Sequence, residues 1–141
     1  MSLNQTSEIT DARAVLETES SAIKLAAERL DANFIRAVEI LDVPDGKIVV
    51  TGLGKSGHVG RKIAATFCST GSPAVFMHAS EAVHGDLGVH QSGNPTIFLS
   101  NSGSTSELLA LVPILRNRCS SLVGILGNLD GVLAQKMDVA L

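Results

Sequence analysis

The fold is decided by residues 48–57, which read IVVTGLGKSG. This stretch opens with a short β-branched run, passes through a glycine-rich turn and leads into a helical pattern from Ser56 to about Cys68. A short apolar strand that is followed directly by a helix is the first half of a parallel βαβ unit. The stretch therefore predicts a strand, a tight turn and a helix in succession.

Apolar runs of the same kind recur along the rest of the chain. We expect further strands at residues 74–77, 96–99 and 122–126, the opening of a fifth strand at 138–141, and a helix at about 104–116. Short apolar strands that alternate with helices are typical of a parallel sheet with helices on both faces. The sequence therefore predicts an α/β fold, a parallel-sheet α/β/α sandwich of the flavodoxin-like or Rossmann-like kind with N-terminal helices.

The chain before this sheet has a different pattern. Apolar residues recur at three- and four-residue steps from Leu16 to Leu41, which predicts helices with one apolar face. Asp31-Ala32-Asn33 either breaks this segment into two helices or lies on its polar side, and a turn at residues 44–46 ends it. We expect an N-terminal helical segment at residues 1–46, a second part at residues 47–141, and packing of the apolar face against another subunit.

Composition and charge exclude several classes of protein. The 141 residues suit one globular domain, with 45% apolar residues and a mean hydropathy of +0.28. A net charge of −3 and the lack of Trp and Tyr disfavour a nucleic-acid binder. The longest apolar run, residues 108–115, is too short to span a bilayer, and the start of the chain does not resemble a signal peptide. The two cysteines, Cys68 and Cys119, lack metal-site spacing and favour a reduced, cytoplasmic protein.

Ligands of open parallel sheets bind at the carboxyl ends of the strands, so the loops there are the candidate site. The first loop, residues 52–57, reads as G-x-G-x-x-G, the fingerprint of a dinucleotide site. That fingerprint also needs an acidic residue about 20 positions on, at the end of the next strand, where this chain has Met77-His78. A plain glycine-rich turn without a ligand is the other alternative. Lys55 and Ser56 at the helix start favour an anionic ligand.

The loop after the third strand, residues 100–106, is more informative. Five of its seven residues carry hydroxyl groups, and the loop leads directly into a helix. Backbone N–H groups, the positive end of a helix and several hydroxyls together form a phosphate site. The alternative interpretation is a capping box at residues 104–107, in which Glu107 bonds back to the N-cap. Because a cap uses one hydroxyl and this loop has five, the sequence predicts phosphate binding.

The loop after the second strand holds two histidines and two acidic residues within residues 78–86. A single histidine more often satisfies a hydrogen bond in a protein core, but four such groups after a central strand exceed what packing needs. His58 and His90 have less context, so we expect each of them to be structural or exposed.

Several ungapped motifs together resemble the sugar isomerase (SIS) domain of the arabinose-5-phosphate isomerases. They are GLGKSGHVGRK at 52–62, AATF at 64–67, STG at 69–71, HGDLG at 84–88 and SNSG at 100–103. The resemblance implies an SIS domain at residues 47–141 and an isomerase that interconverts ribulose 5-phosphate and arabinose 5-phosphate through an enediol(ate). It also implies a role in Kdo and lipopolysaccharide or capsule biosynthesis, and a tetramer whose active sites are shared between subunits.

The resemblance also assigns site residues by position. It implies that Lys55, His84 and Glu107 are catalytic. The substrate contacts that it implies are Ser56, Gly71, Ser72, Ser100, Asn101, Ser102 and Thr105. His78 matches a residue that contacts a metal or the substrate, so a divalent ion such as zinc, if one binds, is expected there. No cofactor is expected to be required.

Such an isomerisation moves a proton between C1 and C2, which needs a carboxylate or imidazole near the carbon acid and an electrophile for the developing oxyanion. Glu107 fits the first role and Lys55 the second, while His84 could shuttle protons between the sugar oxygens. The sequence leaves open which residue takes the C2 proton, since the family's second glutamate lies beyond Leu141. Family members continue with a second catalytic glutamate, a second catalytic histidine and a paired regulatory domain, all beyond the position of Leu141. We therefore expect residues 1–141 alone to be impaired in catalysis.

A second hypothesis is a non-catalytic SIS module that binds or senses a sugar phosphate, as in certain transcriptional regulators. Those regulators carry a basic helix-turn-helix domain before the SIS fold, whereas the chain up to Lys47 has nine acidic and five basic residues. The sequence therefore favours the isomerase, as a cytoplasmic homo-oligomer with a sugar-phosphate substrate and no nucleic-acid or membrane partner.

Overall fold

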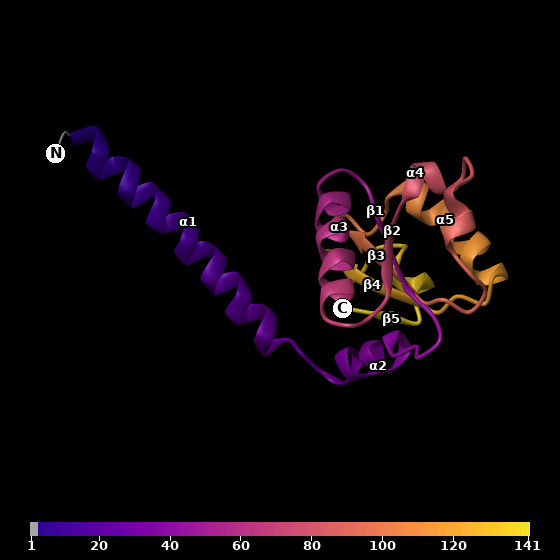
Figure 1. The fold of residues 1–141 in the computed structure, drawn as a ribbon. Coiled ribbons are helices and arrows are strands. Elements are labelled where there is room, and N and C mark those ends of the chain that lie inside the picture. The colour runs from indigo at the N-terminus through magenta and orange to yellow at the C-terminus, as the bar shows by residue number, and fades with distance from the viewer. Residues whose placement is uncertain (1–2) are drawn as a thin grey trace. The chain divides into compact units, whose positions relative to one another are not determined.

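The structure, a computed structural model, describes residues 3–141 (Figure 1). The chain divides into two compact units between Ala32 and Asn33. This division lies at the expected helix break, because helix α1 ends at Glu28 and helix α2 begins at Ala32. Of the two interpretations of Asp31-Ala32-Asn33, the one with two helices is confirmed. The domain boundary expected between residues 46 and 47 stays a prediction.

Helix α1, Leu3–Glu28, makes up the first unit. The hydroxyls of Thr18 and Ser21 each donate to the carbonyl four residues earlier, at 2.7 and 2.9 Å. Large apolar side chains are exposed along it: Ile9, Val15, Leu16, Ile23 and Leu25. Helices in proteins gain most of their stability from packing. Burial of these apolar side chains against a partner would therefore stabilise α1. Between residues 3 and 141, no helix has the length and apolar character needed to cross a membrane.

A five-stranded parallel sheet forms the centre of the second unit, in the order β2-β1-β3-β4-β5. The strands are β1 Ile48–Gly52, β2 Ala74–His78, β3 Thr96–Ser100, β4 Leu122–Leu126 and β5 Val139–Ala140. Each predicted strand is present, with ends that differ by at most two residues in the first four. The parallel sheet is confirmed, and its strand order is that of flavodoxin-like folds.

Helices cover both faces of this sheet (Figure 1). Helix α3, Gly54–Ser69, and α2, Ala32–Leu41, share a core on one face with alternate strand residues: Ala37, Ile48, Val50, Ala64, Ile97, Leu99, Val123 and Val139. Helices α4, Ala79–Ala82, and α5, Ser106–Asn117, share the core on the other face: Val49, Met77, Ala79, Ala82, Phe98, Leu108, Leu111, Val112, Leu115, Leu122, Leu126 and Leu133. Short 3-10 helices, η1 at Asp86–Val89 and η2 at Ala134–Lys136, complete the unit. The α/β/α sandwich is thus confirmed.

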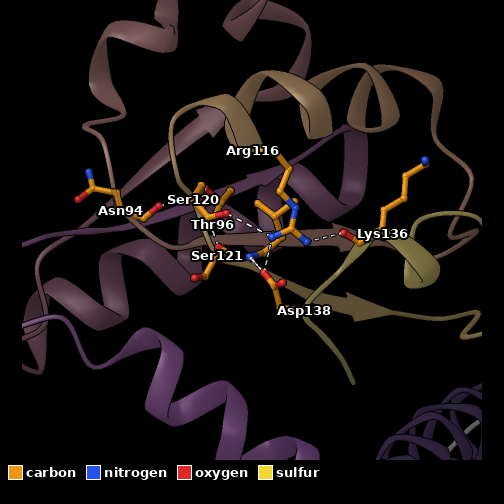
Figure 2. A network of polar contacts seen from close by, with 8 residues as sticks. Asn94, Thr96, Arg116, Ser120, Ser121, Lys136 and Asp138 are labelled. Carbon is orange, nitrogen blue, oxygen red and sulfur yellow. Dashed lines mark hydrogen bonds and ion pairs between the residues drawn. The ribbon is translucent and has the colours of Figure 1, made fainter.

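A polar network ties α5 to the amino ends of β4 and β5 (Figure 2). The Arg116 guanidinium donates to Asp138 Oδ2 at 2.6 Å and to the carbonyl of Lys136 at 2.9 Å. The same Asp138 oxygen accepts the backbone N–H of Leu122, the first residue of β4, at 2.7 Å. Asp138 therefore joins a helix and two strands at the end of the sheet opposite to the predicted site.

Helix α5 is followed by a residue in the left-handed backbone region, since Cys119 has a φ of +56°. The N–H of Ser120 donates to the carbonyl of Leu115 at 3.1 Å, and that of Cys119 to the carbonyl of Arg116 at 2.9 Å. These are the two bonds of a Schellman motif, in which the left-handed position is usually glycine. A side chain with a Cβ is strained there.

We expect Cys119→Gly to raise the free energy of unfolding by about 1 kcal/mol, because glycine enters the left-handed region without a steric cost. Urea denaturation measures the change. Cys119→Ser is the control, since it removes the thiol but keeps the Cβ, and it should unfold like the wild type. If the two variants were equally stable, the gain would not come from the backbone.

Candidate active site

β1 and β3 are neighbours in the sheet. The chain continues from β1 into α3 on one face of the sheet and from β3 into α5 on the other face. Ligands of open α/β sheets bind at such a point, at the carboxyl ends of the strands. A cleft of about 400 Å³ lies there, lined by Lys55, Ser56, Val59, Leu99, Ser100, Asn101, Ile125, Leu126 and Gly127. The structure therefore brings together four of the predicted site residues: Lys55, Ser56, Ser100 and Asn101.

The first loop places a cation and a hydroxyl in the first turn of α3. Lys55 is exposed and Ser56 is half-buried. Leu53, which precedes the helix, has an apolar side chain and so cannot accept a hydrogen bond from the first N–H groups. The start of α3 can therefore donate these N–H groups to an anion, beside the Lys55 ammonium.

The loop after β3 uses its buried hydroxyls to fix its own shape. Ser100 is buried, and its Oγ accepts the backbone N–H of Gly103 at 3.1 Å and lies 3.0 Å from Thr105 Oγ1. Gly103 has a φ of +66°, which lets the chain fold back over Ser100. The Ser102 Oγ is exposed and accepts the N–H of Ser104 at 3.3 Å. The structure therefore gives the hydroxyls of Ser100 and Thr105 a shaping role and leaves that of Ser102 at the surface.

The capping-box interpretation of Glu107 is wrong. Helix α5 begins at Ser106, so Thr105 is the N-cap, and the Thr105 hydroxyl bonds to Ser100 instead of capping the helix. The exposed Glu107 carboxylate accepts the Ser106 hydroxyl at 2.8 Å. The N–H of Glu107 itself and the Ser106 hydroxyl lower the pKa of this carboxyl below its ordinary value. At neutral pH the start of α5 thus presents an ionised carboxylate that the cap does not use.

The two predicted site histidines lie on the chain that follows β2. His84 is exposed, just after α4, and does not line the cleft. His78 ends β2, with its Nδ1 2.8 Å from Ser80 Oγ and its ring edge-on to Phe76. Among residues 3–141, the structure has no group of three His, Cys, Asp or Glu side chains placed to hold a metal ion. Metal binding at His78 stays a prediction.

The Gly71-Ser72 turn precedes β2, so it lies at the amino end of that strand. It lines a different cavity, of about 530 Å³, whose walls are mainly apolar side chains of α2, α3 and the sheet. Within one chain the structure does not bring this turn to Lys55. Its contact with the sugar stays a prediction.

His58 and His90 fulfil the expectation of exposed or structural histidines. His58 is exposed on α3. His90 is 2% exposed, and its Nε2 lies 3.0 Å from the carbonyl oxygen of Asn94, which also accepts the Ser120 hydroxyl at 2.7 Å. Burial lowers the pKa of His90, so the ring is neutral at neutral pH and holds the chain before β3 in place.

The loop after β4 also contributes to the cleft, and the sequence motifs did not predict it. Gly127 lines the cleft, and its N–H donates to the carbonyl of Ser100 at 3.0 Å, which extends the pairing of β3 and β4 by one residue. The signal was present, because Gly127-Asn128 directly follows an apolar strand and marks another carboxyl-end loop.

The chain is similar to known proteins in sequence and in structure. A family model described as SIS domain matches residues 43–141. The arabinose 5-phosphate isomerase KdsD of Pseudomonas aeruginosa is 41% identical over 133 residues, which cover 94% of this chain and 41% of that protein. KdsD of Escherichia coli K12 is 43% identical over 129 residues, 92% of this chain and 39% of that protein. The chain thus spans about two fifths of the length of these curated relatives.

Among solved structures, an Escherichia coli CFT073 protein in complex with arabinose 5-phosphate matches with a TM-score of 0.90 and 36% identity. The match covers 99% of this chain and 73% of that chain. The family model spans the whole sheet and each loop of the cleft, and the relatives agree with it in sequence and in structure. On these grounds the chain belongs to the SIS domain family.

Proposed function

We propose that this chain is the phosphate-binding and catalytic front part of an isomerase that interconverts ribulose 5-phosphate and arabinose 5-phosphate, for Kdo and lipopolysaccharide or capsule biosynthesis. The observation that carries the proposal is the cleft in which Lys55 and Ser56 meet Ser100 and Asn101. The relatives support the choice of substrate, because both KdsD proteins are named arabinose 5-phosphate isomerases and the structural neighbour is a complex with that sugar phosphate.

A sugar phosphate suits this cleft on both polar and apolar grounds. The phosphate would accept N–H groups at the start of α3, the Ser56 hydroxyl and groups of the loop after β3, beside the Lys55 ammonium. Apolar walls from Val59 and Leu99 would contact the C–H groups of the sugar chain. This division of polar and apolar groups is typical of small-molecule sites.

The proposed reaction uses the three residues that the family resemblance assigns. The ionised Glu107 carboxylate takes the proton from C2 of the open-chain aldose and returns it to C1 of the enediolate. Lys55 stabilises the negative charge that develops on oxygen, and His84 moves a proton between the oxygens on C1 and C2. The reverse sequence converts the ketose, so no proton is gained or lost overall.

We propose that a tetramer completes this site. Glu107 and His84 do not line the cleft of one chain, so a neighbouring subunit is needed to bring such groups to the bound sugar. The exposed apolar residues of α1 support this assembly, since burying them between copies would stabilise the helix. A metal at His78 would take its remaining ligands from a neighbour, and the reaction itself is proposed without a cofactor. The free cysteines, Cys68 and Cys119, support a cytoplasmic location.

A module that binds a sugar phosphate without converting it is the second candidate. The position of Glu107 and His84 outside the cleft favours it, because binding needs only the cleft residues. Turnover by a hybrid extended to the length of the relatives separates the two functions, since an isomerase exchanges the C2 proton of arabinose 5-phosphate with solvent deuterium and a binding module does not.

Titration calorimetry of the chain with arabinose 5-phosphate, ribulose 5-phosphate, arabinose and NAD tests the proposed ligand class. We expect both sugar phosphates to bind, and arabinose and NAD to bind much more weakly, since neither presents a terminal phosphomonoester. Equal affinity for arabinose and its 5-phosphate would contradict the proposal. Tighter binding of NAD would instead restore the dinucleotide interpretation of residues 52–57.

In the same titration, Ser102→Ala should weaken sugar-phosphate binding by about 1–2 kcal/mol, the scale of one lost hydrogen bond to a charged group. The melting temperature should change little, because this exposed hydroxyl accepts one long bond of 3.3 Å within the loop. Ser69→Ala, at the far end of α3, is the control and should bind like the wild type. An unchanged affinity of Ser102→Ala would remove Ser102 from the site.

A further inference from the structure

The loop after β4, residues 127–131, and the loop after β3, residues 100–105, approach each other backbone to backbone. The N–H of Leu133 donates to the carbonyl of Gly103 at 2.9 Å, and Leu133 is itself fully buried in the core. With the bond from Gly127 N–H to the Ser100 carbonyl at 3.0 Å, the second loop is joined to both ends of the SNSG turn.

Glycine at positions 127 and 131 is required by this approach and not by backbone conformation. Neither residue has a positive φ, so the local backbone would accept an L side chain. A Cβ on Gly131 would lie 2.7 Å from the carbonyl oxygen of Gly103 and 3.0 Å from its Cα. A Cβ on Gly127 would lie 2.6 Å from the carbonyl oxygen of Asn101. Since these neighbours are backbone atoms, the SNSG turn would have to move.

We propose that the loop after β4, residues 127–131, positions the loop after β3, which binds the phosphate in the proposed function. Gly131 is then a positioning residue for the phosphate of the substrate. This inference rests on the proposed function. The close approach of Gly131 to the backbone of Gly103 sets where Gly103 lies, and Gly103 N–H in turn fixes Ser100 Oγ. Asn128 holds the loop in shape, because its Oδ1 accepts the N–H of Asp130 at 3.0 Å. The buried Leu133 anchors the loop to the core, so the position is set by the fold.

Gly131→Ala tests this proposal in the full 141-residue chain, by titration with arabinose 5-phosphate and with inorganic phosphate. We expect the affinity for both ligands to fall by about tenfold, which corresponds to the loss of one hydrogen bond to a charged group. An equal factor for the two ligands locates the loss in the phosphate subsite. A melting curve must show that the variant is fully folded at the titration temperature, because partial unfolding would weaken the binding of both ligands by the same factor as well.

Gly124→Ala is the matched control. It makes the same substitution in β4, also at a non-positive φ, and its Cβ would lie 2.9 Å from the flexible Met137 side chain instead of loop backbone. We expect it to lower the melting temperature and to keep the wild-type affinity for phosphate. If Gly131→Ala does not fold, Asn128→Ala replaces it, because this substitution removes the bond to Asp130 without adding atoms. We expect it to lower the affinity for both ligands by the same factor, which should be smaller than tenfold.

The results separate this inference from the function on which it rests. If the wild type fails to prefer arabinose 5-phosphate over arabinose, the proposed function fails. If the wild type shows that preference and Gly131→Ala binds phosphate with unchanged affinity, only the positioning role is overturned. A lower affinity for arabinose 5-phosphate with an unchanged affinity for inorganic phosphate would also overturn the positioning role, because the substitution would then act on binding of the sugar.

Discussion

Glu107→Gln is expected to slow exchange of the C2 proton of arabinose 5-phosphate with solvent by about 10²–10⁴-fold, the usual cost of losing a general acid–base group. The amide keeps the size and hydrogen-bonding reach of the side chain but cannot accept the proton. The melting temperature should stay close to that of the wild type, because Glu107 is exposed and the capping box that would have given it a structural role does not form. Deuterium incorporation followed by NMR, with a melting curve beside it, measures both quantities.

The relatives are longer than this chain, so the exchange assay uses a protein extended to their length. A hybrid that joins residues 1–141 to the following segment of the Pseudomonas aeruginosa relative supplies it, and the hybrid without substitutions gives the reference rate. Glu39→Gln is the control, because Glu39 is an equally exposed glutamate on α2 and lies outside the cleft. If Glu107→Gln exchanged the proton at the reference rate, the proton transfer would belong to another group.

Asp138→Ala is expected to lower the free energy of unfolding at neutral pH by about 2 kcal/mol. The substitution removes the acceptor of both the Arg116 guanidinium and the Leu122 N–H. The Arg116 and Asp138 side chains are 38% and 31% exposed, so solvent screens the ion pair itself. Most of the loss in the free energy of unfolding should therefore come from the Leu122 N–H at the start of β4, because this N–H loses its carboxylate acceptor. Urea denaturation measures it, with the exposed Glu39→Ala as the control.

The pH dependence of this difference has a definite sign. Burial raises the pKa of Asp138. The hydrogen bonds from Arg116 and the Leu122 N–H, together with the positive charges of Arg116 and Arg36, outweigh burial and hold that pKa below its ordinary value. A carboxyl whose pKa is lower in the folded state stabilises the fold above its unfolded pKa of about 3.9. That stabilisation is lost as the pH falls through the lower pKa of the folded state. The difference in the free energy of unfolding between wild type and Asp138→Ala should therefore become smaller below about pH 4. If this difference stayed constant there, the carboxylate would not be its source.

Local sequence predicted the features that depend on neighbours along the chain. The apolar runs gave the strands, because a parallel strand buried on both faces must be apolar throughout, as Val49 and Val50 illustrate. The hydroxyl-rich loop and the Lys55 turn were found for the same reason, since each follows a strand and starts a helix. The carboxyl-end rule then placed both in one cleft.

Features that depend on tertiary approach were not predictable in this way. The capping box at residues 104–107 failed because α5 begins at Ser106, so that Thr105 and not Ser104 is the N-cap. The Thr105 hydroxyl bonds to Ser100, five residues earlier, and propensity rules do not weigh such competition. Arg116 and Asp138 are 22 residues apart, so their pairing follows only from the placement of α5 beside β5. The periodicity of α1 shows an apolar face without showing what covers it.

The hydrogen bonds around Asp138 join α5 to the amino ends of β4 and β5, whereas the cleft lies at the carboxyl ends of the strands. A strand of five residues is about 16 Å long, and substitutions separated by more than about 10 Å with no shared partner usually have additive effects. Substitutions in the Asp138 network and in the cleft are therefore expected to have additive effects. Substitutions in the loops of the cleft can therefore change ligand recognition without removing the contacts around Asp138. This separation makes the domain evolvable.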